Sequence, residues 1–168
     1  MIRFLSSLLM LVALVACENT GGSGGGGVPR LGDPVEVRFR HVDSVNALRA
    51  ARGLGEVALS STLTAAAATH ARDMSVQKRA WHFGSDRSSP VSRAQRAGYG
   101  GQVLAENISE SFDDEFEVIQ QWLNDPQALA AMMNPRASAI GLGWYQESSG
   151  KIWWVQMFGG APVGAVGF

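Results

Sequence analysis

The 168-residue sequence contains a single cysteine, Cys17, and only three histidines. No disulfide can form within the chain and no cluster of thiolates can bind a metal, so the fold must depend on its hydrophobic core. The residues that follow Arg3 carry 13 basic and 15 acidic side chains, a net charge of −2. Because nucleic-acid binding relies on clustered Lys and Arg, this composition gives no support for nucleic acid as a partner.

Long apolar runs are also missing, apart from one near the start. Residues 4–16 follow Arg3 and are apolar except for two serines. A helix that crosses a bilayer needs about 20 residues, so this run fits a secretory signal better than a membrane span. It ends in LVAC at Cys17, which resembles the bacterial lipobox, although a plain signal peptide is the alternative. We predict a lipoprotein signal peptide over residues 1–17, acylation of Cys17, and a lipid anchor in the inner or outer membrane of the bacterial cell envelope.

Glycine is concentrated directly after this cysteine. Residues 18–32 read ENTGGSGGGGVPRLG and form a predicted flexible linker, because they offer little to bury. A G-x-S-x-G match at residues 21–25 would indicate a nucleophile elbow only between a strand and a helix, and here it lies in the linker. Residues 33–168 are then predicted to form one domain of ordinary size.

The apolar pattern of this domain predicts helices on both sides of a hairpin. A first helix is expected after Asp33-Pro34, with the stripe Phe39, Val42, Val45 and Leu48. A second is expected after Ser60 or Ser61, with the stripe Leu63, Ala66, Ala67, His70 and Met74. Shorter helices are predicted over 92–97 and 127–133 and another after Ser111, with strands over 103–108 and in the hairpin 140–158. We expect His70 to be a core residue with one hydrogen-bond partner.

One stretch gathers polar groups that are suited to a site. Residues 81–107 hold the imidazole of His82 and the carboxylate of Glu106, separated by residues typical of turns. Such groups on a loop-lined hollow can bind a cation or move a proton. The alternative is that both are ordinary surface or core residues. The acidic run at residues 110–117 is interpreted as a solvated face.

Several of these motifs, in this order and spacing, resemble the bacterial branch of the CAP superfamily of cysteine-rich secretory, antigen 5 and pathogenesis-related proteins. The matching residues span about 40–160 and are Asn46, Arg49, Gly53-Leu54, Leu63, Ala66-Ala67, His70-Ala71, Asp73-Met74, His82, Ser85-Asp86, Arg93, Ala97-Gly98-Tyr99, Ala105-Glu106-Asn107-Ile108, Trp122, Ile140-Gly141-Leu142-Gly143, Trp153-Trp154-Val155-Gln156 and Phe158-Gly159. The resemblance implies an α+β fold, a three-layer α-β-α sandwich with a small, mainly antiparallel sheet between helices. Residues 33–168 would form the CAP domain.

The resemblance also implies a cavity, because many members carry two histidines and two acidic residues that bind zinc or another divalent ion in some cases. His82 matches the first histidine, Glu106 the first acidic residue and Asp125 the second, while Ala128 stands where the second histidine is expected. The implied cavity is therefore His82, Glu106 and Asp125. His82 and Glu106 remain weak metal candidates, because a stable zinc site takes three or four protein ligands.

Two functions are compatible with a cavity that lacks one of the four expected side chains. The first is a membrane-tethered, non-enzymatic binding or interaction module whose ligand is a small lipid or a protein. The second is a metal-assisted or acid/base hydrolase that uses His82 and Glu106. No serine-nucleophile motif lies in the folded part, and no catalytic residue or cofactor can be assigned, so the sequence favours the first function.

Overall fold

The computed structural model describes residues 30–162 of the chain. The predicted signal peptide, Cys17 and residues 18–29 of the predicted linker lie outside the described residues. Leu31, which lies in the predicted linker, packs against the core. The described helices are α1 (Pro34–Ala50), α2 (Ser61–Gln77), α3 (Pro90–Arg96), α4 (Glu115–Asn124) and α5 (Pro126–Met132). The described strands are β1 (Ala58–Leu59), β2 (Gln102–Glu110), β3 (Ala139–Gln146) and β4 (Ile152–Gly160).

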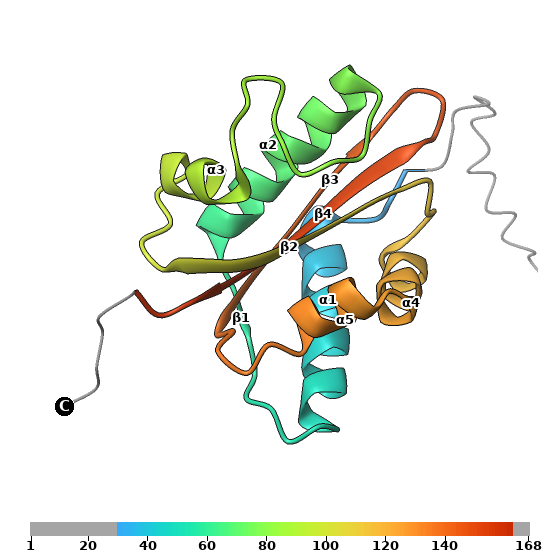
Figure 1. Ribbon diagram of the computed structural model, residues 1–168. Coiled ribbons are helices and arrows are strands. Elements are labelled where there is room, and N and C mark those ends of the chain that lie inside the picture. Colours follow the sequence, from blue (N-terminus) through green and yellow to red (C-terminus); the bar gives the residue numbers. More distant parts are fainter. Residues whose placement is uncertain (1–29, 163–168) are drawn as a thin grey trace, which may run out of the picture.

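The four strands form one mixed sheet in the order β1-β3-β4-β2. The two-residue strand β1 runs parallel to β3, whereas β3–β4 and β2–β4 are antiparallel. Helices α1, α4 and α5 lie on one face of the sheet and α2 and α3 on the other (Figure 1). The predicted α+β, three-layer arrangement is confirmed. None of the helices between residues 30 and 162 is both long and apolar enough to cross a bilayer.

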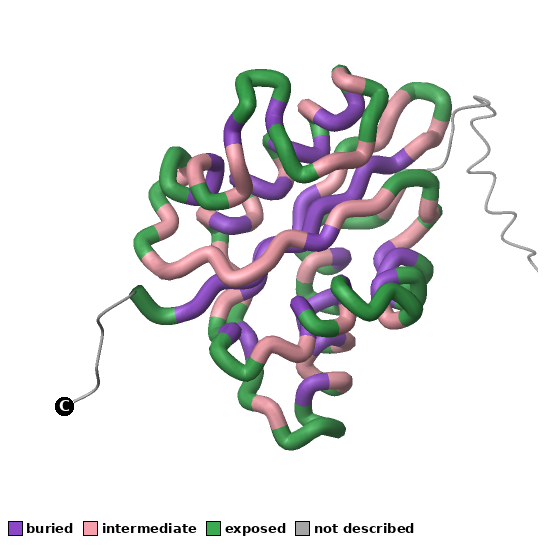
Figure 2. The backbone as a smooth tube through the Cα atoms, viewed as in Figure 1, coloured by how far each residue is buried: buried purple, intermediate pink, exposed green. Residues whose placement is uncertain are grey.

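The sheet separates two hydrophobic cores. One core lies under α1, α4 and α5 and includes Trp122 and Trp154, and the other lies under α2 and α3 and includes Met74 and Trp153. Every residue of β4 is buried, and the central strands form the buried middle of the molecule in Figure 2. A strand that is buried on both faces lacks the usual apolar–polar alternation, which matches the apolar hairpin of the sequence.

Helix α1 begins as predicted and buries Val42 and Val45 of the predicted stripe, but not all of that stripe. The Asp33 carboxylate accepts from the backbone N–H groups of Val35 and Glu36, and Pro34 occupies the first turn. Phe39, predicted in the buried stripe, is 53% exposed, whereas Arg49 is fully buried. The guanidinium of Arg49 donates to four carbonyls, and these belong to Gly55, Met132, Asn134 and Ala137. It thereby satisfies the carbonyl end of α5, which no helical N–H can reach.

Helix α2 buries the predicted stripe and lies very close to the sheet. All five residues of the stripe, His70 among them, are buried. Two glycines of β3 permit this approach, because a Cβ at Gly141 would overlap the backbone of Leu63 and one at Gly143 the backbone of Ala67 and Ala68. Small residues on both elements therefore bring α2 into backbone contact with the strand.

Helix α4 starts later than predicted. Its N-cap is Asp114, which accepts from Phe116 and Glu117, rather than Ser111. Ser111 has a left-handed backbone (φ 69°), and Phe116, in the first turn of α4, is 48% exposed. An aspartate one residue before the helix is as good a cap as serine, so the capping pattern alone could not separate the two.

Candidate functional site

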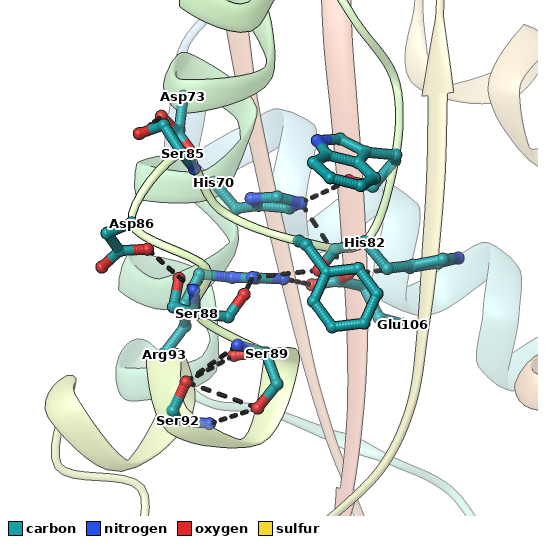
Figure 3. Close-up of polar contacts among 12 residues, drawn as sticks. His70, Asp73, His82, Ser85, Asp86, Ser88, Ser89, Ser92, Arg93 and Glu106 are labelled. Atoms are coloured by element: carbon teal, nitrogen blue, oxygen red, sulfur yellow. Dashed lines mark hydrogen bonds and ion pairs between the residues drawn. The ribbon is translucent and has the colours of Figure 1, made fainter.

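The structure brings together the two groups singled out in the sequence. Nδ1 of His82 lies 2.9 Å from Oε1 of Glu106, and it carries the hydrogen because a carboxylate can only accept. Their burial differs sharply, with the side chain of His82 51% exposed and that of Glu106 only 1% exposed. His82 therefore lies at the surface, in the loop between α2 and α3, while Glu106 projects from β2 into the interior (Figure 3).

A third residue, Arg93 of α3, completes this cluster. Its guanidinium forms an ion pair of 2.6 Å with Oε2 of Glu106, and the side chains of Arg93 and Glu106 are 5% and 1% exposed. The same guanidinium donates to the carbonyls of His82 and Ser88. Sequence reasoning placed Arg93 within the family match but gave it no role. Both Glu106 oxygens are thus engaged, one by His82 and one by a permanent cation.

His70 of α2 approaches the cluster from the other side. Burial lowers the pKa of His70, although the nearby Glu106 carboxylate acts in the opposite direction. The ring is therefore neutral, and its Nε2–H donates to the carbonyl of Trp81 at 2.9 Å. The 3.9 Å between this nitrogen and Glu106 is too long for a hydrogen bond. The structure confirms His70 as a core residue with one hydrogen-bond partner.

These contacts hold three consecutive backbone carbonyls. That of Trp81 accepts from His70, that of His82 from Arg93, and that of Phe83 from Gln77 at 3.3 Å. The indole N–H of Trp81 also donates to the Gln77 side chain at 2.8 Å. We call residues 81–83 the aromatic loop. Its backbone is fixed by side chains from α2 and α3, with Glu106 of β2 as the charged centre.

The chain after the aromatic loop is held just as closely. Asp73 of α2 accepts from both the backbone N–H and the hydroxyl of Ser85 at 2.7 Å. Hydrogen bonds from Ser88, followed by the ion pair with Arg96, lower the pKa of Asp86. A hollow of about 520 Å³ opens between this segment and the two helices, and both His70 and Arg93 line it. His82 and Glu106 are not among the residues that line this hollow.

The predicted third member of the cavity, Asp125, lies elsewhere. Its carboxylate is the N-cap of α5, where it accepts from the N–H groups of Gln127 and Ala128. The Ala128 carbonyl in turn accepts from Asn107, which neighbours Glu106 on β2 and therefore points to the opposite face of the sheet. Among the described residues Asp125 makes no hydrogen bond or ion pair with His82 or Glu106, and its carboxylate caps a helix, so its place in the cavity stays a prediction.

Asn107 begins a second polar cluster, under α1 and α5. Its amide donates to the Ala128 carbonyl and to Oε1 of Gln156, whose own amide donates to Nε2 of His41 at 2.7 Å. All of these side chains are buried. Burial lowers the pKa of His41 to about 3, so this imidazole stays neutral. The cluster holds no charge and links α1, β2, β4 and α5.

The donor set does not suit a divalent cation. Among residues 30–162, no three His, Cys, Asp or Glu side chains are grouped so that they could hold a metal ion. His82 and Glu106, the two candidates, lie against the guanidinium of Arg93, which repels a cation and already occupies one carboxylate oxygen. Zinc would find one imidazole and one shared oxygen, fewer ligands than a stable site takes.

The fold and this motif order are those of a known family. A profile described as the Cysteine-rich secretory protein family (CAP) matches residues 42–158, well over half of the chain. The chain belongs to this family. The CAP domain thus contains the aromatic loop, the charged cluster around Glu106 and the neutral cluster around Asn107.

The chain is also similar in sequence to a bacterial protein. The chain is 28% identical to the uncharacterized protein YkwD of Bacillus subtilis over 118 residues, which covers 70% of this chain but 45% of the relative. The chain therefore spans less than half the length of that relative.

Solved structures share the CAP fold at lower identity. An outer surface protein of Borrelia burgdorferi superposes with a TM-score of 0.70 at 19% identity, covering 77% of this chain and 96% of that one. An extracellular SCP-domain protein of Bacillus anthracis gives a TM-score of 0.67 at 22% identity, covering 79% and 45%. These relatives are outer-surface or extracellular proteins by name.

Proposed function

We propose that the protein is a non-enzymatic binding module of the bacterial cell envelope, tethered through an acyl group on Cys17, that presents the aromatic loop to a partner. The observation that carries this is the state of Glu106, both of whose oxygens are engaged by Arg93 and His82. A general base or a metal ligand must also be reachable by its substrate or ion, whereas the side chain of Glu106 is only 1% exposed. Glu106 instead anchors the groups that fix the loop.

The extracellular or outer-surface names of the structural relatives support an envelope location. The proposal is also supported by the lipobox-like LVAC sequence, which would provide the anchor, and by the glycine-rich composition of residues 18–29, which would connect it to the domain. Acyl chains contribute about 0.8 kcal/mol for each CH₂ group buried in the bilayer, so several chains hold a protein firmly.

Cell fractionation tests this anchor. The wild-type protein should remain in the membrane pellet after a carbonate wash and should carry the mass of acyl groups on Cys17. Replacing residues 1–17 by a cleavable signal peptide without cysteine should release a folded protein under the same wash. If that variant withstands carbonate as well as the wild type does, or if wild-type Cys17 carries no acyl mass, the tethering proposal fails.

One observation favours the hydrolase as a second candidate. An imidazole that donates through Nδ1 to a buried carboxylate, with the rest of its ring exposed, has the orientation of a general base. No serine or cysteine side chain is bonded to His82 in the described part of the chain, so water would have to be the nucleophile. Turnover of ester or amide substrates that is lost in His82→Ala would decide for this candidate and against the binding module.

A further inference from the structure

The aromatic loop exposes apolar surface on a fixed backbone. Phe83 is 50% exposed, and its ring packs edge-on against Trp81 with centroids 5.6 Å apart. The guanidinium of Arg79 lies 4.0 Å from the centre of the Trp81 ring. Val76, in the last turn of α2, is 73% exposed. Because three carbonyls of the loop are already held, presenting these rings to a partner costs little ordering entropy.

The charge around this loop differs from that of the rest of the domain. Residues 72–96, here called the basic segment, carry six basic and two acidic side chains, a net charge of +4. The other described residues carry seven basic and twelve acidic side chains, a net charge of −5. Within the described part of the chain, Arg72, Arg79 and Arg87 form no ion pair, so their charge is not neutralised by a neighbour. Glu106 and Glu147, which lie outside this segment, pair with Arg93 and Lys78, so the net charge that remains is +2 (+4 − 2). The basic segment is thus complementary to an anionic surface.

The loop also lies near the end of the domain from which the tether leaves. Lys78, at the C-terminal end of α2, forms an ion pair of 2.9 Å with Glu147 beside the β3–β4 turn. Arg30 lines a groove together with Lys151 of the same turn. The start of the described chain and the end of α2 lie toward the same end of the molecule (Figure 1). The twelve residues between Cys17 and Arg30 can reach about 40 Å at full extension, so the anchor leaves the loop free to meet the membrane.

We propose that the aromatic loop and the basic segment dock on the anionic phospholipid surface to which the chain is tethered. Trp81 and Phe83 enter the headgroup region, where aromatic rings are favoured, and Arg79 and Arg87 contact lipid phosphates. A positive segment on a domain whose other described residues are net negative favours an anionic lipid surface as the partner, because the proposed tether already holds the chain at a membrane. The proposal rests on the envelope location given above, because it names the partner that the loop meets there.

Vesicle sedimentation tests this docking without the anchor. Both hydrophobic cores lie within residues 30–162, so residues 18–168 can be used without an acyl group. This chain should sediment with vesicles of mixed phosphatidylglycerol and phosphatidylcholine, but not with phosphatidylcholine alone, and salt should weaken the binding. Phe83→Ala should reduce the partition coefficient at least about tenfold, and Arg79→Gln about fivefold.

Two matched variants serve as controls. Phe116→Ala removes an equally exposed phenylalanine from the acidic start of α4, and Arg136→Gln removes an exposed arginine outside the basic segment. Both should bind the vesicles as the parent does, and all four variants should melt near the parent temperature. Docking is refuted if the parent chain ignores anionic vesicles at low salt, or if Phe116→Ala and Phe83→Ala lose equal binding. Neither outcome changes carbonate-resistant anchoring through Cys17, so the two proposals fail separately.

Discussion

Two adjacent residues of β2, Glu106 and Asn107, begin two polar clusters that solve the problem of buried polarity in different ways. On the α2 and α3 side, Glu106 is paired with the cation of Arg93, and the cluster reaches the surface at His82. On the other side, Asn107 joins Gln156 and His41 in a neutral set that stays fully enclosed. The charged cluster holds a surface loop, and the neutral one holds the layers together.

The short motif Ala105-Glu106-Asn107 therefore supports both a surface loop and the packing of the layers. Successive side chains of a strand point to opposite faces, so the sequence Ala-Glu-Asn delivers its carboxylate and its amide to separate compartments. A buried ion pair is costly to break because it leaves a lone charge behind, whereas a broken neutral hydrogen bond leaves only a dipole. Variants of the two residues should therefore differ in both magnitude and location of effect.

The largest effect is expected for Glu106→Gln. The amide keeps the shape of the side chain but leaves the buried Arg93 charge unpaired, which should cost about 3–5 kcal/mol of unfolding free energy. Amide hydrogen exchange over residues 81–89 should rise more than elsewhere. Glu110→Gln is the matched control, because it breaks the exposed Glu110–Lys151 pair on the same strand and should cost at most about 1 kcal/mol. Equal stability of the two variants in urea would contradict the anchoring role of Glu106.

A smaller loss is expected for Asn107→Ala. The Ala128 carbonyl and Oε1 of Gln156 would lose their donor, at a cost of about 1–3 kcal/mol. Exchange should increase over residues 126–132, in α5, and remain unchanged over the aromatic loop. If the loop loosens as much as α5 does, the two clusters are not independent.

The smallest effect is a dependence on pH that belongs to the neutral cluster. The pKa of His41 is about 3 in the folded protein, so the unfolded chain binds the extra proton below its own pKa, near 6.5. Stability from this group is present above pH 6.5 and is lost as the pH falls toward 3. Lowering the pH from 7 to 5.5 should cost about 1 kcal/mol, measured by urea unfolding. His41→Gln should reduce this slope and leave the part due to His70, whose pKa burial also lowers. An unchanged slope would exclude His41 as a source.

Local patterns in the sequence sufficed for much of the fold. Helix α2 and the β3–β4 hairpin were predicted because a helical stripe and a pair of apolar segments around Ser148-Ser149-Gly150 are short-range signals. Strand β1 has two residues, too few for any periodicity to show. The burial of Arg49 could not be predicted from local patterns, because it depends on carbonyls up to 88 residues away.

In the candidate site, too, residues could be identified from local patterns, whereas contacts between distant elements could not. His82 and Glu106 could be singled out by residue type and by the family motif. The pairing of Arg93 with Glu106 could not, since it depends on how α3 packs against β2. For Asp125 a local signal existed, because an aspartate before a proline at a helix start is first of all an N-cap. That signal was outweighed by the position of Asp125 in the family pattern.

The contact of Gly141 and Gly143 with α2 bears on how this protein can diverge. Most helices shift against their sheet when core side chains change volume over evolutionary time. Here the helix lies on the main chain of β3, so its distance from the sheet does not depend on side-chain size at these positions. His70, Asp73 and Gln77 hold the segment 81–85 from this helix. We expect segment 81–85 to keep its position even in homologues whose core residues differ. A larger residue at position 143 would displace α2 and, with it, this segment.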